Sequence, residues 1–175
     1  MKSFSLLFLM PLLVGLATIA LAPQAILPGL AMAEELSLSS KGWQSTVVKI
    51  EGVNTSKALA VGEVKQPDAA EYCERDPGGM TKRYGGKLTK EQCIEQILRE
   101  EKGKLYSASA DCPRKTILTE FGSFTLVGID YSAGFPDFKW RDNQSGKILD
   151  GSNASGAPVV ESQFKLLCPA FIKRK

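Results

Sequence analysis

Acidic side chains are the residues of this sequence that could make it an enzyme. Two carboxylates that flank a glycosidic bond can hydrolyse it, one as general acid and the other as base or nucleophile. The chain has 19 acidic residues, and the candidates for such a pair are Glu71, Glu74, Asp76, Asp130, Asp137, Asp142 and Asp150. No two of them stand in a pattern more specific than chance. Surface charge, helix capping and turn formation account for these residues more simply.

Histidine is absent from the chain. Its absence excludes Ser-His-Asp and Cys-His nucleophile systems and zinc sites that depend on imidazole. We therefore expect neither a metal nor another cofactor, and the sequence favours a protein that is not an enzyme. Without a side chain that ordinarily titrates near neutral pH, stability should change little between about pH 6 and pH 8.

Aromatic residues surround a Gly/Pro connection within 130–141. Exposed aromatic rings can stack on sugars or anchor a partner protein, and Trp, Tyr and Arg are enriched in binding hot spots. The residues that we expect to form a binding surface are Tyr131, Phe135, Trp140 and Arg141. The alternative is that Phe138 and Trp140 are core residues of one strand, while Tyr131 and Phe135 hold the loop.

The first 33 residues contain the three regions of a secretory signal in their usual order. Lys2 precedes an apolar run over 4–21, and Ala31-Met32-Ala33 forms a small-x-small cleavage site. A retained membrane anchor is the alternative, because the apolar run is just long enough to span a bilayer. A proline and a glycine inside the run favour cleavage. We therefore expect export to the periplasm or the exterior, with no membrane span after cleavage.

The rest of the chain suits a single domain. The polar segment 34–41 is expected to be a flexible lead-in, and 42–175 a single disulfide-bonded α+β domain. Without Lys2, 21 basic and 19 acidic side chains remain. This balance argues against nucleic acid as a partner, because phosphate neutralisation needs a clustered basic excess. The basic end, 173–175, is expected to be a solvated tail.

Strand and helix patterns are segregated along the chain. Strands are expected over 43–53, 58–64, 105–110, 116–119, 123–130, 137–141 and 147–149. Helices are expected after an N-cap at Asp68, from Thr89 to about Lys102, and from Pro158 to about Cys168. The pattern predicts an α+β fold: a small antiparallel sheet with about three short helices packed on one face and two disulfides.

The four cysteines are Cys73, Cys93, Cys112 and Cys168. An even number in an exported chain indicates disulfides, whereas a metal site would need closely spaced cysteines or histidine. Cys73 and Cys93 lie on the apolar faces of two successive expected helices, so we favour their pairing, which leaves Cys112 for Cys168. Four cysteines allow three pairings, and the sequence alone does not choose among them.

Two functions remain open on these grounds. The first is a small exported module, non-enzymatic, that binds an envelope protein or glycan or has a structural role in the envelope. The second is a small hydrolase of cell-wall polysaccharide that uses two carboxylates. The missing catalytic signature favours the first.

Overall fold

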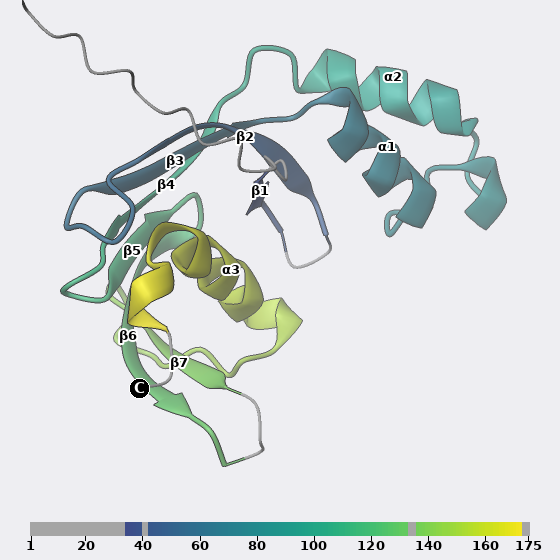
Figure 1. The fold of residues 1–175 in the computed structure, drawn as a ribbon. Helices are drawn as coiled ribbons and strands as arrows, with labels where there is room; N and C mark the ends of the chain where they lie inside the picture. The colour runs from purple at the N-terminus through teal and green to yellow at the C-terminus, as the bar shows by residue number, and fades with distance from the viewer. Residues whose placement is uncertain (1–33, 40–41, 133–135, 173–175) are drawn as a thin grey trace, which may run out of the picture. The chain divides into compact units, whose positions relative to one another are not determined.

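The computed structural model describes residues 34–39, 42–132 and 136–172 (Figure 1). The predicted signal peptide over 1–33 lies outside these ranges, as do Phe135 and 173–175. The described residues form seven strands: β1 (Glu35–Ser37), β2 (Gln44–Glu51), β3 (Ala58–Glu63), β4 (Tyr106–Asp111), β5 (Thr116–Thr119), β6 (Gly122–Asp130) and β7 (Asp137–Asp142). Their helices are α1 (Gln66–Arg75), α2 (Lys90–Glu100) and α3 (Ala157–Leu167), with 3-10 turns η1 (Lys82–Tyr84), η2 (Asn153–Ser155) and η3 (Pro169–Phe171). None of these helices is long and apolar enough to cross a membrane.

The seven strands form one antiparallel sheet in which each strand pairs with its neighbours in sequence. The register shifts between Val47 and Lys49 in β2 and between Leu126 and Gly128 in β6. A bulge of this kind bends its strand and increases the local twist. The sheet accordingly curls around α3 (Figure 1). The predicted α+β class with an antiparallel sheet is confirmed.

The core lies between the concave face of the sheet and α3. In β3 and β4 this face carries only small buried side chains, Ala58, Ala60, Ala108 and Ala110. Such residues let a helix approach the sheet closely, and α3 contacts both strands as well as β1 and β5. In β6 and β7 the buried side chains are larger: Phe124, Leu126, Phe138 and Trp140. From α3 come Val160, Phe164 and Leu167, all fully buried.

The segment before β2 belongs to the sheet. Glu35–Ser37 pairs with β2, and the Leu36 side chain is 0% exposed. Gln163 of α3 donates a hydrogen bond from its amide nitrogen to the Ser37 carbonyl at 2.6 Å. The expectation of a flexible lead-in over 34–41 is therefore wrong at these residues. At the other end, the expected strand over 147–149 is reduced among the described residues to one bridge, between Arg141 and Ile148.

Asp68 fastens α1 to β2. Its carboxylate accepts hydrogen bonds from the Thr46 N–H at 3.1 Å, the Thr46 hydroxyl at 2.9 Å and the Lys65 N–H at 2.6 Å. The helix begins at Gln66, earlier than expected, because Pro67 fits the first turn of a helix. Asp68 therefore caps the helix from inside the first turn rather than from the position before it. Trp43 adds an edge-to-face contact with Tyr72, with ring centroids 4.3 Å apart.

Both predicted disulfides are confirmed. Cys73 of α1 is bonded to Cys93 of α2, and Cys112, just after β4, is bonded to Cys168 at the end of α3. All four residues are buried. The first bond holds the two helices together, whereas the second joins the sheet to the helix that covers it.

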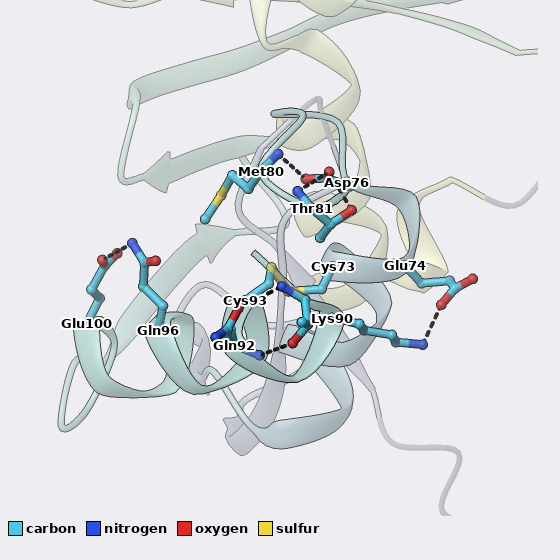
Figure 2. The surroundings of a disulfide bond; sticks show 11 residues. Cys73, Glu74, Asp76, Met80, Thr81, Lys90, Gln92, Cys93, Gln96 and Glu100 are labelled. Carbon is cyan, nitrogen blue, oxygen red and sulfur yellow. Dashed lines mark hydrogen bonds and ion pairs between the residues drawn. A yellow bond between two sulfur atoms is a disulfide. The ribbon is translucent and has the colours of Figure 1, made fainter. Parts of the chain in front are cut away.

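The connection between α1 and α2 is fixed by a buried carboxylate beside the first disulfide (Figure 2). Asp76 accepts hydrogen bonds from the N–H groups of Met80 and Thr81, both at 2.7 Å, and from the Thr81 hydroxyl at 2.9 Å. On the outside, Glu74 pairs with Lys90, which opens α2. The Asp76 contacts hold the connection against the end of α1 and satisfy the backbone donors of Met80 and Thr81.

Candidate functional site

Of the four residues expected to form a binding surface, the three that the structure describes do not share one. Tyr131 is half-buried at the end of β6, and Phe135 lies outside the described residues. Trp140 is 0% exposed, whereas Arg141 is exposed on the opposite face of β7. Successive side chains of a strand point to opposite faces, so Phe138 and Trp140 enter the core together. The assignment of Trp140 as a ligand contact is therefore wrong, and the alternative interpretation as a core residue is correct.

Most of the candidate catalytic carboxylates already hold local structure. Glu71 pairs with Arg75, and Glu74 with Arg83 and Lys90. Asp130 and Asp150 each accept the N–H of the residue two positions later, at 2.8 and 2.9 Å. Asp142 does the same for Gln144 at 2.8 Å.

Local hydrogen bonds also set the acidity of these groups. They lower the pKa of Glu74, Asp130, Asp142 and Asp150. At Asp76 burial raises the pKa, but hydrogen bonds from Thr81 and Met80 outweigh it and the net direction is down. A general acid at neutral pH needs the opposite direction. None of these five groups therefore has the acidity of a catalytic proton donor.

Two of the seven candidates do meet, at a pocket of about 290 Å³ between β7 and the start of α3. Asp137, Asp150 and Glu161 all line it. Asp137 is paired with Lys139, and Glu161 with Lys165, so two of the three charges are neutralised locally. No group of three or more acidic or cysteine residues in the described part of the chain is placed to hold a metal ion.

A second cleft, of about 340 Å³, opens where the β5–β6 turn, the end of β7 and the segment leading into α3 come together. Its apolar lining consists of Phe121, Phe124, Leu149 and Val159. Its polar lining includes Ser39, Asp142, Asn153 and Ser155. Ligand pockets typically combine apolar and aromatic walls with a few placed polar groups, in volumes of about 300 to 1,000 Å³. This cleft has both properties, so it is the candidate binding site.

Phe121 is the exposed aromatic residue of the cleft. The two residues Glu120 and Phe121 connect β5 to β6, and the Phe121 N–H donates to the Thr119 hydroxyl at 3.0 Å. This bond fixes the turn and leaves the ring 55% exposed, while Phe124 beneath it is 6% exposed. A single exposed apolar residue is normal on a protein surface. Phe121 is informative because it lines a cleft together with other apolar side chains and with several polar ones.

The polar lining contains one carboxylate. Asp142 accepts the Ser145 hydroxyl at 2.7 Å on one oxygen and the Gln144 N–H at 2.8 Å on the other. These two bonds lower the pKa of the Asp142 carboxyl, the Ser145 hydroxyl contributing most. Asp142 is therefore ionised at neutral pH and is held by its own turn. Asn153 begins η2 beside it, with its side chain exposed.

Sequence reasoning missed Phe121 and Asn153. An aromatic residue between two expected strands, in the short stretch after 116–119, was the available signal for Phe121. Asn153 begins an Asn-Ala-Ser sequence typical of a polar turn, but only the tertiary structure brings it to the same cleft as Asp142. No family model matches the chain, and neither the curated proteins nor the solved structures include a match. Its function is therefore inferred from its own geometry.

Proposed function

We propose that the protein is an exported, non-enzymatic binding module of the cell envelope, and that the cleft beneath Phe121 takes one ring-sized unit of an envelope glycan. The observation that carries this proposal is that an exposed aromatic ring and several polar groups line the same cleft. A sugar ring has an apolar face that packs on an aromatic side chain and hydroxyl groups around its edge that need hydrogen-bond partners. Phe121 and Asp142 offer these two kinds of contact.

The volume of the cleft favours a single unit rather than a long segment. At about 340 Å³ it stands at the small end of ligand pockets. A glycan chain would place one unit in the cleft and leave its neighbours on the surface. We expect such a site to bind each sugar unit with modest affinity and to bind repeatedly along a polymer.

Binding without turnover is supported by the charges of the cleft. Glycoside hydrolysis needs two carboxyl groups on either side of the scissile bond. Asp142 is the one acidic residue among the described residues that line this cleft, and its pKa is lowered. It is therefore suited to accept hydrogen bonds from a ligand and unsuited to protonate a leaving group.

Export is supported by the two disulfides, which form and persist in oxidising compartments. The bonds are compatible with the periplasm and with the exterior. Together with the sequence pattern of 1–33, they favour a protein that folds after crossing a membrane.

The alternative is a hydrolase built on the other pocket. The observation in its favour is that Asp137, Asp150 and Glu161 meet there. Against it stand the ion pairs of Asp137 and Glu161 and the lowered pKa of Asp150. Release of new reducing ends from cell-wall polysaccharide by the oxidised protein, abolished in Asp137→Asn, would favour the hydrolase and contradict the proposal.

The direct test compares two exposed apolar side chains that lie close in sequence. Oxidised protein obtained by secretion is titrated with soluble oligosaccharides of the envelope, and binding is measured by calorimetry and by amide chemical shifts. Phe121→Ala should weaken binding roughly tenfold or more. Leu118→Ala is the control, because Leu118 is 56% exposed and Phe121 is 55% exposed, but Leu118 does not line the cleft. Equal loss in both variants, or binding only to an envelope protein with the cleft unaffected, would overturn the proposal.

A further inference from the structure

The cleft beneath Phe121 has an asymmetric charge. Among the described residues that line it, Asp142 is negative and none is basic. The remaining polar lining consists of hydroxyl and amide groups. A ligand in this cleft therefore meets one fixed negative charge beside an aromatic wall. Both features favour a cation, because ring faces also attract ammonium groups.

Asp142 keeps acceptor capacity for a ligand. A carboxylate has about four acceptor positions, and the contacts within the protein, from the Gln144 N–H and from the Ser145 hydroxyl and N–H, use no more than three of them. These contacts hold the group in place before any ligand arrives, so little ordering is needed on binding. The free lone pairs are suited to a charge-assisted hydrogen bond from an ammonium group.

The start of α3, which could have attracted an anion instead, offers no free donor at its first positions. The Ala157 N–H donates to the Ser155 hydroxyl at 3.3 Å. Pro158 has no N–H, and the Val159 N–H donates to the Gly156 carbonyl at 3.0 Å. Backbone donors at a helix N-terminus bind phosphate or carboxylate only when they are unpaired. The first positions of α3 therefore offer no unpaired backbone donor to an anion, whereas the Asp142 carboxylate offers a negative charge to a cation.

We infer that the cleft selects a glycan unit with an unacetylated, protonated amino group: the ring packs on Phe121 and the ammonium group binds Asp142. This inference rests on the proposed function and narrows its ligand. A lysine side chain of a partner protein also carries an ammonium group, but its flexible stem has no hydroxyl groups for the Asn153 amide at the rim. An aminosugar supplies the apolar face, the cation and the hydroxyl groups together.

The test uses three tetrasaccharides that differ in charge: one of glucosamine, one of N-acetylglucosamine and one of a uronic acid. We expect the glucosamine tetramer to bind most tightly, and its affinity to fall as salt is added or as the pH is raised until the amine loses its proton. Asp142→Asn keeps an oxygen for the Gln144 N–H but removes the charge. It should weaken glucosamine binding about tenfold to a hundredfold.

Asp150→Asn is the matched control. Asp150 holds a similar turn through the Ser152 N–H, but it lines the other pocket. It should leave affinity unchanged, and near-ultraviolet circular dichroism should show both variants folded. An N-acetylated tetramer that binds as tightly and still depends on Phe121 would overturn the inference and leave the proposed function standing. Binding of a lysine-rich peptide through Asp142, without any sugar binding, or no effect of Phe121→Ala on any ligand, would overturn both.

Discussion

Trp140 and Phe164 meet edge to face in the core, with ring centroids 5.2 Å apart and ring planes at 70°. Both side chains are 0% exposed. The contact joins β7, a strand at the edge of the sheet, to the helix that fills the curl. Among the described strands β7 pairs with β6 alone, and its other side has a single bridge, between Arg141 and Ile148. Packing against α3 is therefore an important part of what holds it.

Loss of the Phe164 ring should therefore lower the free energy of unfolding substantially. Phe164→Ala leaves a cavity between β7 and α3, and buried Phe-to-Ala changes cost about 3 to 5 kcal/mol. Phe121→Ala is the matched control, because its ring is 55% exposed, and it should change the free energy of unfolding by about 0.5 kcal/mol or less. Urea unfolding followed by tryptophan fluorescence measures both. Similar costs for the two variants would contradict the packing described for α3.

The two disulfides should contribute to different parts of the structure. The Cys112–Cys168 bond closes a loop of 56 residues between the sheet and α3, and its loss should lower global stability by about 4 kcal/mol. The Cys73–Cys93 bond closes a loop of 20 residues, worth about 3 kcal/mol on the same basis.

Paired Cys-to-Ala variants and amide hydrogen exchange distinguish these contributions. In Cys73→Ala/Cys93→Ala, exchange should rise first in α2, which packs mainly on α1. In Cys112→Ala/Cys168→Ala it should rise in α3 and the sheet together. Uniform acceleration in both variants would show that the molecule unfolds as one cooperative unit.

The favoured disulfide pairing and the positions of most strands could be predicted because local patterns carry them. Cys73 and Cys93 lie on the apolar faces of successive helices, so the fold brings them together once those helices pack. In β7, alternation placed Phe138 and Trp140 on one face and Arg141 on the other. The expectation of Trp140 as a ligand contact relied on residue type, whereas this alternation supports the alternative, a core residue, as which Trp140 is found.

The remaining features depend on contacts between distant segments. Strand β1 has three residues, Glu35–Ser37, which are too few to show a period, and it exists through its pairing with β2 and the burial of Leu36 under α3. The cleft joins Ser39, Phe121, Asp142 and Val159. Only the curl of the sheet around α3 brings these positions together, and no local pattern in the sequence encodes it.

Tyr106 should titrate at an unusually high pH for a tyrosine. Burial, followed by its hydrogen bond to the Glu101 carboxylate and the negative charges of Glu101 and Glu120, raises the pKa of Tyr106 to about 12. A raised pKa in the folded state gives stability that is present below about pH 10 and is lost as the pH rises towards 12. Absorbance at the tyrosinate band should show one group titrating late, and Tyr106→Phe should remove it. A titration that shows no such late group, or one that Tyr106→Phe leaves unchanged, would contradict the contact with Glu101.

The response of stability to acid follows from the carboxylates. Hydrogen bonds and ion pairs lower the pKa of Glu74, Glu91, Asp130, Asp142 and Asp150, and at Asp76 hydrogen bonds outweigh burial. A group with a lowered pKa stabilises the fold above its unfolded value, and this contribution disappears as the pH falls through its folded value.

Stability should therefore be level between about pH 6 and pH 8 and fall below about pH 4. Glu35 acts in the opposite direction, because burial, followed by the charges of Glu71 and Asp68, raises its pKa. Glu35 is a single group at the junction of β1 and α1, and the carboxyl groups with a lowered pKa outnumber it. Thermal unfolding across pH 2.5 to 8 measures how the midpoint depends on pH. Asp76→Asn should make the midpoint fall less steeply in acid. The three hydrogen bonds to Asp76 favour its charged form, and the variant removes that charge. A midpoint that shifted strongly between pH 6 and pH 8 would require a titrating group that this histidine-free chain does not supply.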